Sequence, residues 1–498
     1  MQRRNEAFQV RQQAAVAQHQ LPVVPHPTNG DDDRYHNKIA SYTKGLPHNQ
    51  LGEVDLSAYD RLIKALDSER AGDFDAIPLG CQDPTRRKLV CPQAGAAFDL
   101  EATDCQQLFM PSAPAFNSAE RAAEAVELYW MALTRDVPFH SYVSDPTALA
   151  AADELSGLTK FTGPKQNGSV RADTLFRGAT PGDLTGPYIS QFLFKPARFG
   201  VQELSQKFAI YAQGIEFMTT YDDWLAIQNG CGPTASRQFG PTRYILTGRD
   251  LATYVHTDVS YQAYLNACLI LLGMGAPLNP GNPYRSSQTQ VGHSTFGTPH
   301  IMTLVAEVAT RALKAVWFQK WYVHRLLRPE TFGGRLHNVM VNGAGYPIHA
   351  QVLTSYAVKE VGKRNGTYLL PQAYPEGSPT HPSYAAGHAA IAGACATILK
   401  AFFDETFIIP NPEIPSEEGS TLVPYNGQLT VGGELNKLAA NISNGRNFAG
   451  IHWRKDFVEG AKLGEDVAIS LLRDQRYTFN EPFSGFTFTK FDGTQITV

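Results

Sequence analysis

The sequence predicts a mainly α protein built from helix bundles, with one small β-hairpin at its C-terminus. Four segments carry apolar residues at helical spacing and are separated by loops rich in Gly, Pro and Asn. These segments are residues 117–135, 200–214, 260–274 and 301–328. The final stretch, FTFTKF-DG-TQITV, alternates around Asp492-Gly493, a pair typical of hairpin turns. Helices with a single terminal hairpin favour bundles over an α/β sheet.

The composition predicts a globular enzyme or binding protein for a small or anionic ligand. Apolar residues make up 43% of the 498 residues and charged residues 18%, so a sizeable core can form. The net charge of −4 argues against nucleic acid as the main partner, because phosphate binding needs a basic excess. No apolar run reaches the roughly 18 residues of a membrane span. The N-terminus lacks the apolar segment of a secretory signal, and both a cytoplasmic location and export by another route stay open.

Residues 1–50 are predicted to form an arm that packs on a neighbouring subunit. They are rich in Gln, His, Asn and Asp and lack the apolar pattern of a core.

The six cysteines contain no CxxC pair, which excludes a zinc ribbon or a thioredoxin-like motif. Cys268 and Cys395 lie in apolar helical segments and are predicted to be buried thiols. Cys81 and Cys91 flank the loop LGCQDPTRRKLVCPQ at a spacing that a disulfide allows, with Cys105 as a competing or intersubunit partner. The alternative is three free thiols in a reducing compartment.

Two of the predicted helices have clear end signals. Asn117 and Glu120 form an N-x-x-E capping pattern at the start of 117–135. Pro329 ends 301–328, because its ring prevents the helix from continuing.

The end of the helix 301–328 carries a possible cationic stripe. Lys320, His324 and Arg328 recur every four residues and so share one face of that helix. Cations on an apolar helix require an anion if they are buried. The alternative is a solvated basic face that compensates the helix dipole.

A second segment, GSPTHPSYAAGHAAIAGACATILKAFF, is a loop that enters a helix of small residues at Gly387 and His388. Free N–H groups at a helix start bind oxyanions, and His388 is placed to exchange protons with such a ligand. His381 is a second candidate donor. The alternative is a capping histidine on a tightly packed helix.

The third segment is NISNGRNFAGIHWRKDFVEGAKLGEDVAISLL. Arg446 and His452 flank a turn of small residues, and Asp456 follows His452 by four positions. A carboxylate there can accept the ring N–H of His452, fix its tautomer and raise its basicity. The alternative is an ordinary Arg/Asp surface pair with a capping histidine.

Together, Lys-x7-Arg-Pro, Gly-His at a helix start and Arg-x5-His resemble the signature of vanadium haloperoxidases and of the type-2 phosphatidic-acid-phosphatase-like acid phosphatases. The Lys-to-Arg gap and the flanks WFQKWYVHRLLRPE resemble the algal and cyanobacterial bromoperoxidases, whereas the phosphatases and fungal chloroperoxidases usually have a gap one residue shorter. The resemblance covers most of 45–498 and includes AAEAVELYWMALTRDVPF, GNPYRSSQTQ and GSPTHPSY.

The resemblance implies vanadate as cofactor. It also implies that hydrogen peroxide oxidises a halide, with bromide as the expected substrate. The implied ligands of vanadate are Lys320, Arg328, Arg446, the Gly387 N–H and His452, the last bound to vanadium itself. His388 is the implied acid–base residue, and Lys320 the implied polarising group for peroxide. The residues implied near the halide or around the site are His381, Trp317, Gln319, His324, Ala386 and Asp456. Bound calcium occurs in some relatives, but no DxDxDG loop supports a calcium site here.

The chain departs from the family pattern at one position. The family has Pro-Ser-Gly-His at the helix start, and here the sequence is Ala385-Ala386-Gly387-His388. A lost charge-assisted hydrogen bond costs about 1.5–3 kcal/mol, so Ala386 predicts weaker vanadate binding or altered activation.

Other functions use the same residues. In an acid phosphatase, His452 would form a phosphohistidine and His388 would protonate the leaving group. A helical assembly or storage protein that only binds phosphate, and a diverged isomerase, are further alternatives.

The resemblance also implies two four-helix bundles side by side with additional helices, and a homo-oligomer, either a dimer or an assembly of dimers. The expected partners are hydrogen peroxide, halide and small organic acceptors. Because Lys320 and His452 must meet at one site, residues 51–498 are predicted to be a single large helical domain.

Overall fold

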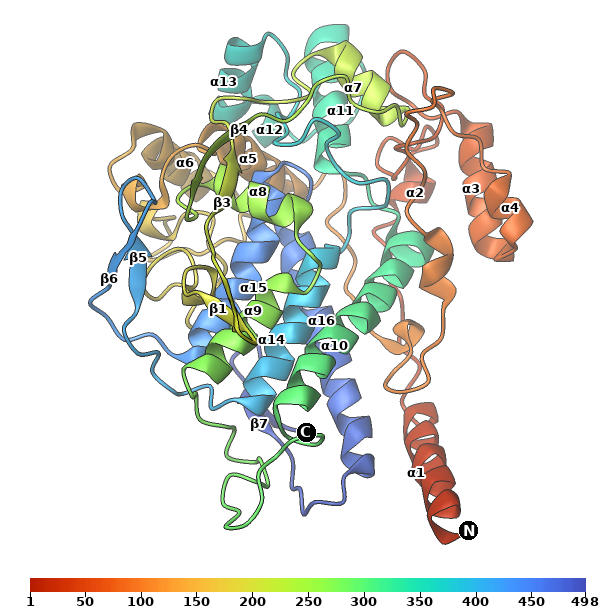
Figure 1. The fold of residues 1–498 in the computed structure, drawn as a ribbon. Helices are drawn as coiled ribbons and strands as arrows, with labels where there is room; N and C mark the ends of the chain where they lie inside the picture. The colour runs from red at the N-terminus through yellow and green to blue at the C-terminus, as the bar shows by residue number, and fades with distance from the viewer.

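The computed structural model describes residues 1–498 and is mainly helical, as the sequence predicts (Figure 1). Its helices are α1 (Gln2–His19), α2 (Asp31–Arg34), α3 (Leu56–Ser68), α4 (Ala71–Asp75), α5 (Ala119–Leu133), α6 (Pro146–Gly157), α7 (Tyr221–Gln228), α8 (Gly248–Thr257), α9 (Gln262–Gly273), α10 (Thr298–Phe318), α11 (Pro329–Asn342), α12 (Ala350–Leu353), α13 (Tyr356–Asn365), α14 (Gly387–Phe402), α15 (Val431–Phe448) and α16 (Arg454–Gln475). None of them is both long and apolar enough to cross a bilayer.

The centre of the molecule is a bundle in which α14 packs against α10, α15 and α16 (Figure 1). Every residue of α14 except His388 is buried. Glycines allow α14 and α16 to approach closely, since a Cβ at Gly393 would lie 1.9 Å from the carbonyl oxygen of Ala461. A Cβ at Gly464 would lie equally close, 1.9 Å, to the carbonyl oxygen of Ala390. A second group of helices, α6, α12 and α13, packs around α5.

The strands form four separate two-stranded antiparallel sheets. Their bounds are β1 (Ala197–Phe199), β2 (Gln202–Leu204), β3 (Phe208–Tyr211), β4 (Phe239–Arg243), β5 (Glu413–Pro415), β6 (Leu422–Pro424), β7 (Thr487–Thr489) and β8 (Gln495–Thr497). The predicted C-terminal hairpin is confirmed, with Phe488 opposite Ile496.

The helix predicted over 200–214 is wrong, because β2 and β3 occupy this segment. Gly200 and Gly214 bound it with φ angles of +63° and +74°, which a right-handed helix does not tolerate. β2 pairs with the adjacent β1, and β3 pairs with the distant β4.

Two other helices differ from prediction at their ends. The N-cap of α5 is Ser118, whose hydroxyl accepts the Arg121 N–H at 3.1 Å, and not Asn117. The predicted helix 301–328 ends as an α-helix at Phe318 and continues only as a π-helical turn, Gln319–His324. Arg325 then has φ +39°, so the chain leaves the helix and Pro329 starts α11. The predicted stripe of Lys320, His324 and Arg328 on one helix face is therefore wrong.

The first 50 residues do not form one uniform arm. Helix α1 buries no residue and projects from the body (Figure 1). In contrast, Tyr42 and Leu46 pack with Trp321 in a buried cluster, and the Lys44 ammonium is buried against Glu330 at 2.5 Å. Contact with another subunit therefore stays a prediction for α1 and does not extend to the buried part of 1–50.

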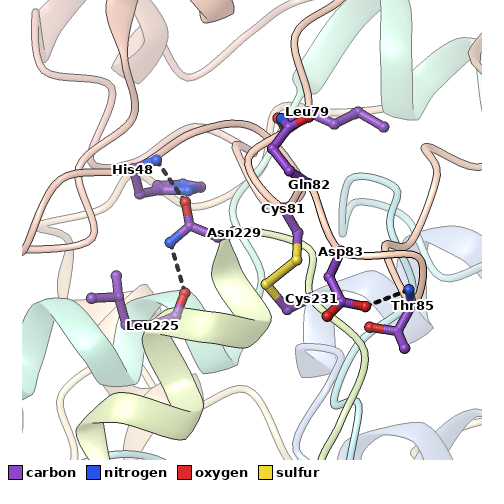
Figure 2. The surroundings of a disulfide bond; sticks show 9 residues. All are labelled: His48, Leu79, Cys81, Gln82, Asp83, Thr85, Leu225, Asn229 and Cys231. Carbon is purple, nitrogen blue, oxygen red and sulfur yellow. Dashed lines mark hydrogen bonds between the residues drawn. A yellow bond between two sulfur atoms is a disulfide. The ribbon is translucent and has the colours of Figure 1, made fainter.

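The predicted Cys81–Cys91 bridge is wrong, because Cys81 pairs with Cys231, 150 positions away (Figure 2). Cys91 is exposed and free, and Cys105 is buried and free. Cys231 follows the end of α7, and only the tertiary fold brings this end beside Cys81. Cys268 and Cys395 are buried free thiols, as predicted.

Candidate functional site

The ends of five elements meet at one cluster of polar side chains. Its members are Lys320 in the turn after α10, Arg328 at the start of α11, Gly387 and His388 at the start of α14, Arg446 in the last turn of α15, and His452 and Asp456 at the start of α16. The loop before α14 adds His381 and Ser383. These residues come from three distant parts of the sequence.

His452 lies between the carboxylate of Asp456 and the guanidinium of Arg328. Its Nδ1 donates to Oδ2 of Asp456 at 2.6 Å, and its Nε2 lies 2.9 Å from Nη1 of Arg328. A guanidinium can only donate, so Nε2 is the acceptor and Nδ1 carries the proton. Burial, together with the charges of Arg328 and Lys320, holds the pKa of His452 well below its usual value. The ring is therefore neutral, with the Nε2 lone pair directed at Arg328.

Oδ2 of Asp456 accepts two further hydrogen bonds, from the Ser383 hydroxyl at 2.5 Å and from the Trp453 N–H at 3.2 Å. Burial raises the pKa of Asp456, and the hydrogen bond from Ser383 and the charge of Lys320 oppose this effect. An oxygen that accepts three donors is in its ionised form. Sequence reasoning missed Ser383, because nothing in the local pattern marks this hydroxyl.

Three buried cationic side chains, Arg328, Lys320 and Arg446, lie close enough to His452 to lower its pKa. Lys320 donates to the carbonyl oxygens of Pro382 and Ser383, both at 2.7 Å, and burial with the charge of Arg328 lowers its pKa well below normal. Burial lowers the pKa of Arg328 to about 10.

Arg446 donates to the carbonyl of Val255 at 2.6 Å, and its buried Nε has no partner. Only one carboxylate, Asp456, belongs to the cluster. Buried positive charge in excess of negative charge is costly unless an anion binds.

His388 occupies the first turn of α14 and is the one partly exposed residue of this helix. Its Nε2 lies 3.0 Å from Oδ1 of Asp258, at the end of α8. Sequence reasoning missed Asp258, because 130 positions separate the two residues and TYVHTDVS carries no recognisable motif. The other ring nitrogen of His388 remains available for proton exchange.

His381 and Trp317 lie beside the cations. Nη2 of Arg328 is 3.0 Å from Nδ1 of His381, and the ring centroids of His381 and Trp317 are 4.7 Å apart. The Lys320 ammonium is 5.9 Å from the centre of the Trp317 ring.

Gln319 and His324 are not brought into this cluster. The amide of Gln319 donates to the carbonyl of Leu108 at 3.1 Å, since neighbours on a helical turn point in different directions. His324 packs on the edge of Tyr384, and burial lowers its pKa to about 3. Ala386 precedes Gly387, and its N–H donates to the carbonyl of Asp456 at 3.0 Å.

The donor set suits an oxyanion that also takes one nitrogen ligand. It offers cationic N–H groups, a helix start and a neutral imidazole with an unprotonated Nε2. No group of three or more His, Cys, Asp or Glu side chains is placed to hold a metal cation.

Known proteins share this arrangement of the chain. The family model for the VCPO second helical-bundle domain matches residues 300–481, which contain every member of the cluster from Lys320 to Asp456. A vanadium-dependent bromoperoxidase of Corallina pilulifera is 37% identical, over 100% of this chain and 98% of its own. The chain belongs to the vanadium-dependent bromoperoxidase family. A bromoperoxidase of the same kind from Ascophyllum nodosum is 36% identical over 99% of this chain and 92% of its own.

A solved member of the bromoperoxidase family has the same fold along almost the whole chain. It is the homohexameric second vanadate-dependent bromoperoxidase of Ascophyllum nodosum, with a TM-score of 0.95 and 32% identity, covering 99% of this chain and 90% of that chain.

Proposed function

We propose that this protein is a vanadate-dependent haloperoxidase that uses hydrogen peroxide to oxidise halide, with bromide as the preferred halide. The observation that carries the proposal is the neutral His452, whose Nε2 accepts from Arg328 at 2.9 Å and whose pKa the charges of Lys320 and Arg446 also lower. The full-length relatives named as bromoperoxidases support the same activity. They do not favour an acid phosphatase that uses His452 as its nucleophile.

The residues that would hold vanadate are Lys320, Arg328, Arg446, the N–H of Gly387 and Nε2 of His452. Bound vanadate would supply a Lewis-acid centre that activates peroxide without a change in oxidation state. The Nε2 lone pair of His452 currently accepts from Arg328. A ligand at Nε2 would replace this hydrogen bond and leave the Arg328 N–H free for an anionic oxygen.

His388 would take a proton from hydrogen peroxide, while Lys320 stabilises the negative charge that develops on peroxide oxygen. The overall reaction joins halide, peroxide and one proton to give hypohalous acid and water. Asp258 would hold the His388 ring through Nε2. His381 and Trp317 are the proposed halide contacts, and the hypohalous acid then halogenates a small organic acceptor.

We also propose a homo-oligomer in which α1 contacts another subunit. An isolated helix that buries no residue is marginal in water, and the solved Ascophyllum nodosum relative is homohexameric. Light scattering should give a mass above that of one chain, and removal of residues 2–19 should lower it. A monomeric full-length protein would contradict the proposal.

The activity is tested by bromination of monochlorodimedone with bromide and peroxide, with and without orthovanadate, beside hydrolysis of p-nitrophenyl phosphate. We expect vanadate-dependent bromination that His452→Ala abolishes and His140→Ala, a change at an exposed histidine, preserves. Phosphate release without peroxide-dependent bromination would overturn the proposal.

A further inference from the structure

Residues 81–91, here called the strap, run from the disulfide-bonded Cys81 to the exposed Cys91. The strap crosses the loop that carries His381. We infer that the strap determines how the protein binds and selects halide, because it fixes the spacing between Trp317 and His381. This inference rests on the proposed function for the role of these two side chains, but its structural basis is independent of it.

The strap is hydrogen bonded along the His381 loop. The N–H of Val90 donates to the carbonyl of Thr380 at 2.9 Å, and the Thr380 hydroxyl donates to the carbonyl of Lys88 at 2.5 Å. Nη1 of Arg87 donates to the carbonyls of Glu376 and Ser378, both at 3.1 Å. These contacts hold residues 376–380, which directly precede His381 in the loop.

The same strap also holds Trp317. The indole Nε1 donates to the carbonyl of Val90 at 3.2 Å. The N–H and the carbonyl of Val90 therefore bond two different walls of the proposed halide pocket, the loop at Thr380 and the side chain of Trp317. A shift of Val90 would change the 4.7 Å separation between the rings of Trp317 and His381.

The position of the strap depends on the Cys81–Cys231 disulfide (Figure 2). Residues 82–86 are exposed, so little packing holds this part of the strap. Beyond the bridge, the N–H of Arg87 donates to the carbonyl of Gly230 at 2.8 Å. A Cβ on Gly232 would lie 2.9 Å from Cβ of Thr85, which shows how closely the strap and the Cys231 segment approach. Both ends of this exposed stretch are thus attached to the residues that follow α7.

A halide ion has no directional bonds, so a protein selects it by the size of a fixed pocket and by the loss of its hydration shell. Val90 provides one hydrogen bond to each wall of this pocket, and Lys88 and Arg87 provide further bonds to the His381 loop. None of these bonds involves a residue proposed to hold vanadate. A typical hydrogen bond contributes about 0.5–1.5 kcal/mol, which corresponds to about a two- to tenfold change in binding. Weakening the strap should therefore change halide binding and leave peroxide activation intact.

The test compares the Cys81→Ser/Cys231→Ser double variant with Cys91→Ser, which removes an exposed free thiol from the same strap. Thr380→Val, which removes the hydroxyl donor to Lys88 but keeps the disulfide, is the second variant. We expect the bromide KM to rise at least about threefold in the double variant and in Thr380→Val. The peroxide KM and kcat should stay within about twofold, and Cys91→Ser should match the wild type.

Tryptic cleavage at Arg86, Arg87 and Lys88 provides a readout that needs no activity. We expect faster cleavage in the double variant than in the wild type or Cys91→Ser. Unchanged cleavage would show that the disulfide does not hold the strap and would overturn the inference. An unchanged bromide KM, or an equal rise in the KM of bromide and of peroxide, would overturn it as well. If trypsin cleaves the strap faster in the double variant than in the wild type, but the wild-type protein does not brominate, the result would instead contradict the proposed function.

Discussion

Oδ2 of Asp456 accepts a hydrogen bond from Nδ1–H of His452 at 2.6 Å and leaves the Nε2 lone pair facing Arg328. The same oxygen binds the Ser383 hydroxyl and the Trp453 N–H. One carboxylate therefore orients the proposed vanadium ligand and also connects the loop before α14 to the start of α16. Removing its charge should affect ligand binding more than the fold.

Asp456→Asn should weaken vanadate binding by about 10- to 100-fold, the usual effect of losing a carboxylate partner of a metal-binding histidine. The reason is that a neutral amide holds the Nδ1–H tautomer less firmly. The measurement is a titration of the vanadate-free protein with orthovanadate, followed by recovery of activity. Asp466→Asn, at an exposed position of the same helix, is the matched control and should titrate like the wild type. Equal affinity of Asp456→Asn and the control would contradict the assignment.

Local spacing was sufficient to predict part of this site. His452 and Asp456 are four positions apart, and Gly387-His388 begins α14 as the small-residue pattern indicates. Such features depend on contacts within a turn or two of chain, which a sequence displays directly. Resemblance to a family added Lys320, Arg328 and Arg446 to the same site. The predicted helical stripe that would have placed Lys320 and Arg328 on one face does not exist.

The rest of the structure depends on contacts between distant residues. Asp258 reaches His388 across 130 positions, and Cys231 reaches Cys81 across 150. Within 200–214, β2 pairs with the adjacent β1, whereas β3 becomes strand because the distant β4 supplies a partner. The π-helical turn after Phe318 has no sequence signal of its own, because its geometry depends on where Lys320 and the start of α11 are held by the rest of the fold.

Ala386→Ser should tighten vanadate binding by about tenfold, because a hydroxyl donor to an anionic ligand contributes about 1.5 kcal/mol at the lower end of its range. Ala386 is the N-cap residue of α14 and provides no side-chain cap. Serine should also raise the free energy of unfolding by about 0.5–1 kcal/mol in the vanadate-free protein. Orthovanadate titration separates the two effects. A gain in stability without a gain in affinity would show that residue 386 caps the helix but does not reach the ligand.

Asp258→Asn should lower kcat by about tenfold and leave vanadate affinity within about twofold. The amide keeps the shape of the side chain beside Nε2 of His388 but removes the charge that stabilises the protonated ring. His388→Ala should cost more, about 100-fold, because it removes the acid–base group itself. Steady-state bromination measures kcat, and orthovanadate titration measures the affinity. A parallel loss of affinity and turnover in Asp258→Asn would indicate that Asp258 supports the fold of the site and not proton transfer.

Glu376 should stabilise the protein at neutral pH and lose this effect in acid. Burial alone would raise its pKa, but the hydrogen bond and charge of His256, 2.6 Å away, lower it to about 2. The imidazole of His256 stacks on Tyr374 at 3.6 Å, and the Arg446 guanidinium lies 5.8 Å from the same Tyr374 ring. The Glu376–His256 pair therefore packs on the same tyrosine ring that lies near Arg446.

The sign of the pH dependence follows from the depressed pKa. The unfolded carboxyl group, with its ordinary pKa near 4.5, binds a proton before the folded one does as the pH falls. The stabilisation is complete above about pH 5 and is lost progressively between there and pH 2. Glu376→Gln should thus reduce the free energy of unfolding by on the order of 2 kcal/mol at pH 7, after allowance for partial exposure, and by less at each lower pH. Urea unfolding of the vanadate-free protein at pH 7, 5 and 4 measures this difference. Glu417→Gln, at an exposed position, should show no such trend, and a difference for Glu376→Gln that stays constant with pH would mean that the carboxylate charge does not contribute.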